Sequence, residues 1–161
     1  MSYSAPLLND DEFEKHLEKA SESNRIIHKK DRINILHVDD DDISLLIFRT
    51  IFEDKYNVFT SSSPQRGREI LKRESIDIIV CDHYMPKETG KDFFKSIEPK
   101  YKSKIKILLT SHASDMGYVS RALKSGEIWA HIVKPVDEQN LIETIEKASK
   151  IIENQKNNAI A

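Results

Sequence analysis

Five short apolar runs alternate with five amphipathic stretches from residue 31 onward, and this order restricts the fold more than any other feature. Two of the runs, Ile33–Val38 and Ile76–Cys81, contain little polarity, which is typical of strands covered on both faces. Such strand–helix alternation predicts an α/β fold with a parallel sheet and helices on both faces. The predicted strands are Ile33–Val38, Tyr56–Thr60, Ile76–Cys81, Ile105–Leu109 and Ala130–Val133.

Each predicted helix carries a start or stop signal. Ser63 precedes Pro64, a residue suited to the first helical position. Thr89 and Asp92 have the spacing of a capping box, with Asp in place of Glu. The other signals are N-caps at Asp42, Ser114 and Asp137 and a helix-ending Gly126. The first helix is predicted from its apolar residues, Ile43, Leu46, Ile47 and Ile51.

The segments on either side of this region are more polar. Residues 10–30 have widely spaced apolar residues among charged ones, so we interpret 1–31 as an N-terminal helical extension. A short dimerising coiled coil is the alternative, because polar Asn24 takes one place in the apolar seam. Residues 151–161 are predicted to be a helix end with a frayed tail. The apolar stripe of this last helix also suits pairing into a homodimer; it comprises Leu141, Ile145, Ala148 and Ile152.

Composition excludes several classes of protein. Among 161 residues the only cysteine is Cys81, which rules out an internal disulfide framework and fits a reducing compartment. A formal charge of −2 leaves no basic footprint for nucleic acid. No run approaches the roughly 18 apolar residues of a membrane span, and the first ten residues lack the pattern of a signal peptide. We therefore expect a cytoplasmic protein that binds neither nucleic acid nor membrane.

Acidic, hydroxyl and cationic side chains follow four of the predicted strands. The first strand leads into Asp39–Asp42, the third into Asp82, the fourth into Thr110 and the fifth into Lys134. In an open parallel sheet, ligands bind outside the carboxyl ends of the strands. We therefore expect these groups to gather at one edge of the sheet.

These groups together suit phosphoryl transfer. Crowded carboxylates repel one another unless a cation intervenes, and Lys134 supplies only one positive charge. Oxygen ligands favour magnesium, calcium or manganese over zinc, and two or three carboxylates are the usual magnesium arrangement. The metal and the lysine would neutralise the transferred group while a hydroxyl binds one of its oxygens. One carboxylate can act as the nucleophile and form an aspartyl phosphate.

Residues 32–150 resemble the receiver domain of two-component response regulators, the CheY-like family. The resemblance rests on ILHVDD at 35–40, CDHYMP at 81–86 followed by Gly90, LLTS at 108–111 and VKP at 133–135. It implies a doubly wound, flavodoxin-like sheet with strand order 2-1-3-4-5. It also implies a phosphorylation-dependent switch that receives its phosphoryl group from a histidine kinase or phosphotransfer protein. The only enzymatic activities implied are self-phosphorylation and autodephosphorylation.

The resemblance assigns roles to individual residues. Asp82 would be the phosphoacceptor, and Asp39 and Asp40 would hold Mg²⁺ together with Asp82 and the main-chain carbonyl of Tyr84. Two further aspartates are interpreted as helix-start residues, favoured by the helix dipole: Asp41 and Asp42.

The switch residues are assigned in the same way. Thr110 would contact the phosphoryl group and move with it, and Lys134 would pair with the phosphate. The bond between Lys134 and Pro135 would be cis, which an X–Pro bond permits. His131 stands at the aromatic switch position, where a tyrosine-like hydroxyl contact is lost. Tyr84 and His112 occupy the positions that tune how water reaches the acyl phosphate, and we hypothesise that Tyr84 shields it.

Three polar residues near the strands are interpreted as structural. His37, inside the first strand, is expected to be packed and hydrogen-bonded. Cys81 is expected to be a buried and unreactive thiol, because burial raises the pKa of a thiol. His83 is interpreted as an ordinary loop residue, with a place on the rim of the site as the alternative.

Two other functions remain open at this point. A haloacid dehalogenase-type phosphohydrolase also uses an aspartate after its first strand, and Asp39 and Asp41 have its Asp-x-Asp spacing, but Asp82 would then have no role. The second alternative is a receiver-fold scaffold that is never phosphorylated. The stretch Ala122–Trp129 resembles receivers that precede output enzymes. These 161 residues contain no recognisable output domain, so two interpretations stay open: a stand-alone receiver, or an output domain or effector outside this chain.

Overall fold

The computed structural model describes residue 15, residues 31–111 and residues 115–160. The predicted helix at 10–30 therefore lies outside the described residues apart from Lys15, and so do His112 and Ser114. From Ile33 onward the chain forms one compact unit. Within the described part of the chain, none of the helices combines the length and apolar character that a membrane crossing requires.

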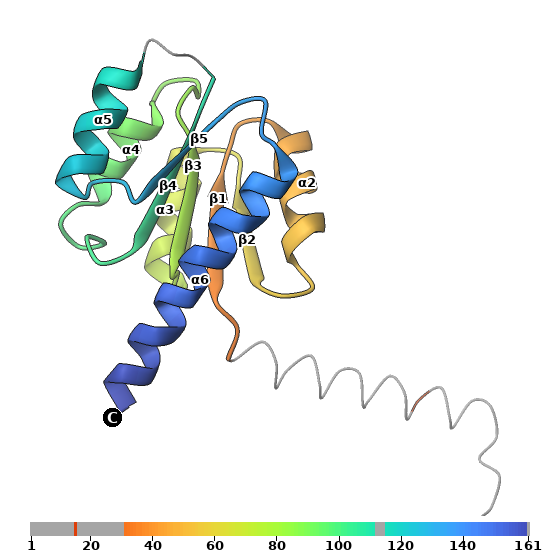
Figure 1. The fold of residues 1–161 in the computed structure, drawn as a ribbon. Helices are drawn as coiled ribbons and strands as arrows, with labels where there is room; N and C mark the ends of the chain where they lie inside the picture. Colours follow the sequence, from red (N-terminus) through yellow and green to blue (C-terminus); the bar gives the residue numbers. More distant parts are fainter. Residues whose placement is uncertain (1–14, 16–30, 112–114, 161) are drawn as a thin grey trace, which may run out of the picture. The chain divides into compact units, whose positions relative to one another are not determined.

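Five parallel strands form one sheet in the order β2-β1-β3-β4-β5, which confirms the predicted topology (Figure 1). The central strands pair in register, with Leu36 opposite both Phe59 and Ile79. Observed bounds differ from the predicted runs by no more than two residues at either end. The strands are β1 (Asn34–Val38), β2 (Asn57–Ser61), β3 (Ile78–Asp82), β4 (Ile105–Thr110) and β5 (Ala130–Val133).

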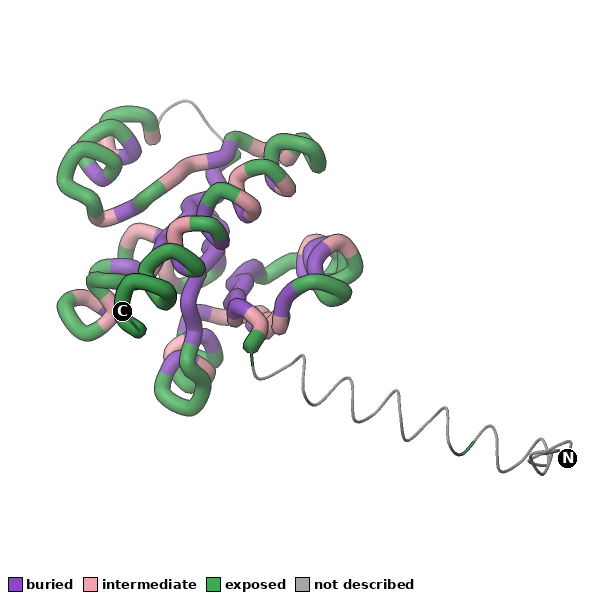
Figure 2. Tube along the Cα trace, turned by 60° about the horizontal axis from the view of Figure 1, so that its bottom comes forward, coloured by how far each residue is buried: buried purple, intermediate pink, exposed green. Residues whose placement is uncertain are grey.

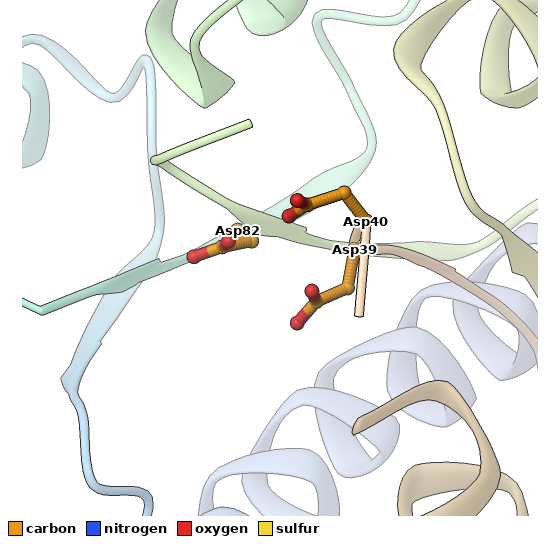
Figure 3. Close-up of side chains that lie close together, drawn as sticks. All are labelled: Asp39, Asp40 and Asp82. Carbon is orange, nitrogen blue, oxygen red and sulfur yellow. The ribbon is translucent and has the colours of Figure 1, made fainter. Parts of the chain in front are cut away.

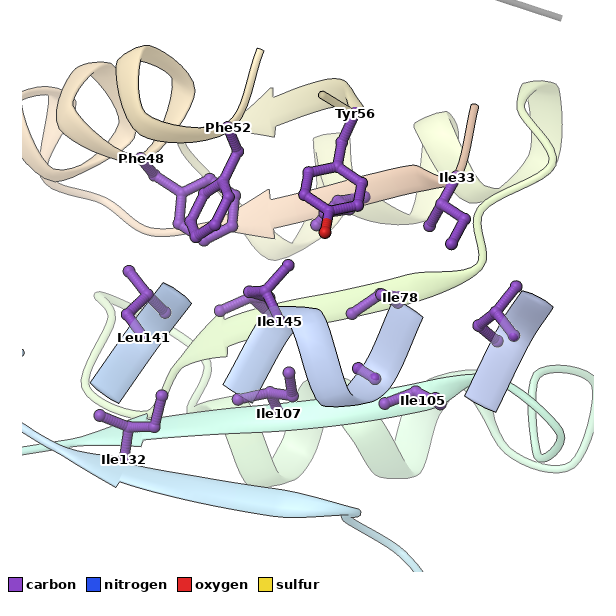
Figure 4. Close-up of a cluster of buried hydrophobic side chains, with 14 of the residues drawn as sticks. Ile33, Phe48, Phe52, Tyr56, Ile78, Ile105, Ile107, Ile132, Leu141 and Ile145 are labelled. Atoms are coloured by element: carbon purple, nitrogen blue, oxygen red, sulfur yellow. The ribbon is translucent and has the colours of Figure 1, made fainter. Parts of the chain in front are cut away.

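Helices cover both faces of the sheet, as a doubly wound fold requires. On one face, side chains of α2 and α6 pack against the strands, and Figure 4 shows Leu141 above Ile132 and Ile145 above Ile107. On the other face, α3, α4 and α5 supply residues such as Leu71, Phe93 and Val119. The helices are α2 (Asp42–Phe52), α3 (Pro64–Arg73), α4 (Gly90–Ile97), α5 (Met116–Ser125) and α6 (Glu138–Ile160).

Most of the predicted helix signals are present in the structure. The Ser63 hydroxyl accepts a hydrogen bond from the main chain of Arg66, and Thr89 forms a capping box with Asp92. Gly126 ends α5 with φ 77°, a left-handed conformation that favours glycine. The N-cap of α2 is Asp41 rather than Asp42, because the Asp41 carboxylate accepts from the main chain of Ile43.

Of the four apolar residues that predicted α2, Ile51 packs against the core and the other three do not hold the helix against the sheet. Leu45, Phe48 and Phe52 are buried, while Ile43, Leu46 and Ile47 are 67%, 64% and 54% exposed. The helix carries apolar side chains on two faces, and its aromatic residues belong to the same core cluster as Ile35 of β1. The exposed set, named here the α2 apolar face, comprises Ile43, Leu46 and Ile47.

The last helix is longer than the sequence predicts. Its buried stripe ends at Ile152 as expected, and the residues beyond it are exposed (Figure 2). The chain nevertheless stays helical to Ile160 instead of fraying from Asn154. The buried stripe at the start of this 23-residue helix stabilises it, and Nζ of Lys156, beyond the stripe, lies 3.4 Å from Oδ1 of Asp77.

Candidate functional site

Three aspartates from two strand ends meet at one edge of the sheet (Figure 3). Val38 pairs with Cys81, so the next residues along the two strands, Asp39 and Asp82, follow at the same edge. Both are buried, whereas Asp40 is exposed. One carboxylate oxygen from each aspartate lies within 4.8 Å of the others. The strand register therefore brings together acids that are 43 positions apart in the sequence, from 39 to 82.

Lys134 joins two of these carboxylates. Its Nζ atom lies 3.3 Å from Oδ2 of Asp39 and 3.1 Å from Oδ1 of Asp82. Its main-chain N–H donates to the carbonyl of Thr110, which fixes the chain where it leaves β5. The bond between Lys134 and Pro135 is cis.

The charges at this edge do not balance. Burial raises the pKa of Asp82, Asp39 raises it further, and Lys134 opposes both effects. Burial alone would lower the pKa of Lys134, but the charges of Asp39 and Asp82 raise it above its ordinary value. Three carboxylates face one ammonium group, so a second cation would relieve the remaining repulsion. The clustered donors are all oxygen atoms, which fits a hard divalent ion such as Mg²⁺.

Thr110 closes the edge from β4. It is fully buried, and its Oγ1 lies 2.9 Å from Nε2 of His131 in β5. Burial lowers the pKa of His131. The two switch residues named by the sequence are therefore in direct contact.

Tyr84 forms a hydrogen bond that the sequence did not predict. Its hydroxyl donates a hydrogen bond to Asp115, which directly precedes α5. Asp115 also lies 3.6 Å from Nε2 of His83, which lies in the loop after β3 as expected but is buried, with 6% of its surface exposed. No local pattern announces these contacts, because they join the loop after β3 to the start of α5. The predicted partner in rate tuning, His112, lies outside the described residues.

His37 is packed but not hydrogen-bonded, which corrects the expectation from the sequence. Its ring lies 4.3 Å from that of Phe48, and neither ring nitrogen has a hydrogen-bond partner among the residues that the structure describes. Burial, helped by the charge of Lys134, lowers the pKa of His37 to about 3. Cys81 is buried as expected, and burial followed by the charge of Asp82 raises its pKa well above the usual value.

The geometry does not favour the Asp-x-Asp arrangement of a haloacid dehalogenase-type hydrolase. Oδ1 of Asp41 accepts from the main chain of Ile43, and its Oδ2 accepts from the hydroxyl of Ser44. Asp41 thus serves as a helix cap, while the carboxylate cluster takes in Asp82 instead.

The family model of the response regulator receiver domain matches residues 35–146. The chain therefore belongs to the response regulator receiver family, a family of signalling domains in two-component systems. A solved receiver domain from Clostridium thermocellum is 30% identical, with a TM-score of 0.69 over 76% of this chain and 98% of that one. The chemotaxis regulator CheY4 of Vibrio cholerae, 23% identical, shares the fold with a TM-score of 0.64 over 73% and 98% of the two chains.

Curated relatives include longer regulators. The hydrogenase transcriptional regulatory protein HoxA of Cupriavidus necator is 28% identical over 114 residues, covering 71% of this chain and 23% of its own length. The transcriptional regulatory protein GlrR of Escherichia coli K12 is 32% identical over 117 residues, covering 71% and 26%. The chain thus spans about a quarter of the length of these relatives.

Proposed function

We propose that Asp82 accepts a phosphoryl group from the phosphohistidine of a histidine kinase or phosphotransfer protein. The observation that carries this proposal is the meeting of Asp39, Asp40 and Asp82 at one sheet edge, with Lys134 bridging two of them. Phosphorylation of this side chain then changes the face that the domain offers to its partners. The proposed receiver spans 32–150.

The carboxylates of Asp39, Asp40 and Asp82, with the main-chain carbonyl of Tyr84, would hold Mg²⁺. When bound, the ion would supply positive charge to the oxygens of the transferring phosphoryl group. The donor set supports this assignment, since all three clustered ligands are carboxylates.

The residues of the chain itself would perform the transfer. A carboxylate oxygen of Asp82 attacks phosphorus, and an oxygen–phosphorus bond forms while the bond from phosphorus to the donor imidazole breaks. Lys134 neutralises a phosphoryl oxygen, and its place beside both Asp39 and Asp82 supports that role. Thr110 then donates its hydroxyl hydrogen to another of these oxygens. Tyr84 covers the acyl phosphate against water while its own hydroxyl is held by Asp115.

The α2 apolar face supports a docking role toward the phosphodonor. Its residues follow directly on the acidic cluster, because α2 begins three positions after Asp39. A donor protein that brings phosphorus to Asp82 also approaches this end of α2, and three exposed aliphatic side chains offer it an apolar contact. We place the kinase or phosphotransfer protein there.

The output of the switch is the next part of the proposal. We propose that the phosphorylated domain acts through an effector or output domain, and that it pairs as a homodimer through α6. We further propose a cytoplasmic location and no catalysis beyond self-phosphorylation and autodephosphorylation. The curated relatives are about four times as long as the segment that matches this chain, which supports the presence of further domains in this class of regulator.

Labelling by a small phosphodonor tests the proposal. With Mg²⁺ and radiolabelled acetyl phosphate, the wild-type protein takes up label, while Asp82→Asn does not and a chelator abolishes uptake. Asp42→Asn is the matched control, because this exposed carboxylate lies at the same edge but starts α2. Equal labelling of wild type and Asp82→Asn would reject the assignment. Absence of labelling would favour the scaffold, and ester turnover that survives Asp82→Asn but not Asp39→Asn would favour the hydrolase.

A further inference from the structure

Thr110 and His131 form a buried polar pair with one shared hydrogen bond. Thr110 has no exposed surface, and its Oγ1 lies 2.9 Å from Nε2 of His131. Among the residues that the structure describes, this hydroxyl has no other hydrogen-bond partner. The ring nitrogen and the hydroxyl therefore have to divide the roles of donor and acceptor between them.

The division follows from the single hydroxyl hydrogen of a threonine. If Nε2 carried a hydrogen, it would donate to Oγ1, and the hydroxyl hydrogen of Thr110 would be buried without an acceptor among the described residues. A buried donor with no partner is costly. The arrangement that satisfies both groups has Thr110 donating to a neutral His131, which carries its ring hydrogen on Nδ1.

Phosphorylation would reverse these roles. In the proposed function, the hydroxyl hydrogen of Thr110 turns to a phosphoryl oxygen on Asp82. Oγ1 then has only lone pairs to offer to His131, and Nε2 loses its donor. A hydrogen on Nε2 restores the bond in the opposite direction. The added charge of about −1.5 to −2 on the phosphoryl group also favours the cationic ring.

We propose that phosphorylation of Asp82 is coupled to proton uptake by His131, through reversal of the Thr110–His131 hydrogen bond. The inference rests on the proposed function, because it requires a phosphoryl group at Asp82. The proton comes from solvent and binds Nε2, so the neutral ring becomes an imidazolium and no other bond is made or broken. A lower pH would then favour the phosphorylated state.

The charged groups around His131 do not already hold it in one protonation state. Among the described residues, no carboxylate lies within 4.0 Å of its ring nitrogens. The neighbouring charges are mostly paired: on β4, Lys106 binds Glu98 at 2.6 Å, and after β5, Lys134 binds the aspartates of the site. On α5 and the turn that follows it, the titratable groups are Tyr118, which donates to Glu127, and the basic residues Arg121 and Lys124.

The size of the coupling sets what an experiment has to resolve. By thermodynamic linkage, the change in the pKa of His131 on binding sets how strongly the affinity at Asp82 depends on pH. A rise of about one unit corresponds to about tenfold tighter binding of a phosphoryl mimic at a pH below both pKa values than at a pH above both. Nitrogen-15 shifts also report which ring nitrogen carries the hydrogen.

The test is an NMR titration of the full chain with Mg²⁺, in the presence and absence of beryllium trifluoride, which mimics the acyl phosphate. The expected result is a His131 pKa at least one unit higher with the mimic, together with a hydrogen on Nε2. In Thr110→Val, which keeps the shape but lacks the hydroxyl, the rise shrinks. In His131→Phe, the affinity for the mimic varies less with pH between 5 and 8 than it does in wild type.

Two kinds of failure are distinguishable. Binding of the mimic with an unchanged His131 pKa contradicts this inference and leaves the proposed function standing. No binding to wild type, or equal binding to Asp82→Asn, contradicts the proposed function and the inference with it. A full pKa rise that persists in Thr110→Val contradicts the reversal of the hydrogen bond as its cause.

Discussion

His37 makes the stability of this domain depend on pH in a way that can be calculated. The folded state holds the ring neutral with a pKa of about 3, whereas an unfolded chain has the ordinary value of 6.5. Below pH 6.5 the unfolded state binds a proton that the folded state does not, so the free energy of unfolding decreases as the pH is lowered. The loss begins near 6.5 and continues until the pH approaches 3.

The magnitude follows from 1.36 kcal/mol per unit of pKa difference. Between pH 7 and pH 5, His37 alone lowers the free energy of unfolding by about 2 kcal/mol. The aliphatic variant His37→Leu lacks this contribution, because it removes the titrating ring and keeps an apolar side chain against Phe48.

Urea unfolding followed by circular dichroism at both pH values, with a chelator present, measures the difference. Wild type is expected to lose about 2 kcal/mol more than His37→Leu over this interval. The variant's absolute stability does not enter the comparison, since each protein is compared with itself at two pH values. Equal losses would show that His37 does not stay neutral in the folded state, and the account of its burial would be rejected.

Three further predictions concern packing, charge and phosphate lifetime. In Gly90→Ala, the new Cβ would lie 2.6 Å from the main-chain oxygen of Asp82, so thermal unfolding should show a loss of stability of about 2–3 kcal/mol. The control is Gly117→Ala, where the new Cβ would lie 3.5 Å from the flexible end of Arg121, and its stability should be unchanged or higher. Glu98→Ala leaves the buried ammonium group of Lys106, which is 1% exposed, without its partner and should lower the free energy of unfolding by about 2–3 kcal/mol in denaturant. Lys106→Met removes the charge itself and should lower it less. Tyr84→Asn should lose its phosphoryl label faster than wild type in a decay assay, and an unchanged decay rate would remove the shielding role.

The sequence predicted those features that depend on local pattern. Burial on both faces leaves an apolar run such as Ile76–Cys81, and caps such as Thr89 mark helix starts within a few residues. The grouping of Asp39, Asp40 and Asp82 was also within reach, because parallel strands place their carboxyl ends at one edge.

Features that depend on packing between distant elements were missed. The bond from Tyr84 to Asp115 spans 31 positions, and no spacing rule connects them. The buried face of α2 was ambiguous because both sides of the helix are apolar, and local pattern does not show that Phe48 is buried while Leu46 is exposed. His37 was expected to find a partner by the general rule for buried polar groups, which the described structure does not follow here.

The most direct test of the central claim is chemical mapping of the phosphorylated residue. Wild-type protein treated with acetyl phosphate and Mg²⁺ is reduced with borohydride, which converts an aspartyl phosphate to homoserine, and is then digested and analysed by mass spectrometry. The account predicts conversion at Asp82 alone, with Asp39 and Asp40 unchanged. Conversion at Asp39 or Asp40, or none anywhere while the protein remains folded and binds Mg²⁺, would contradict it.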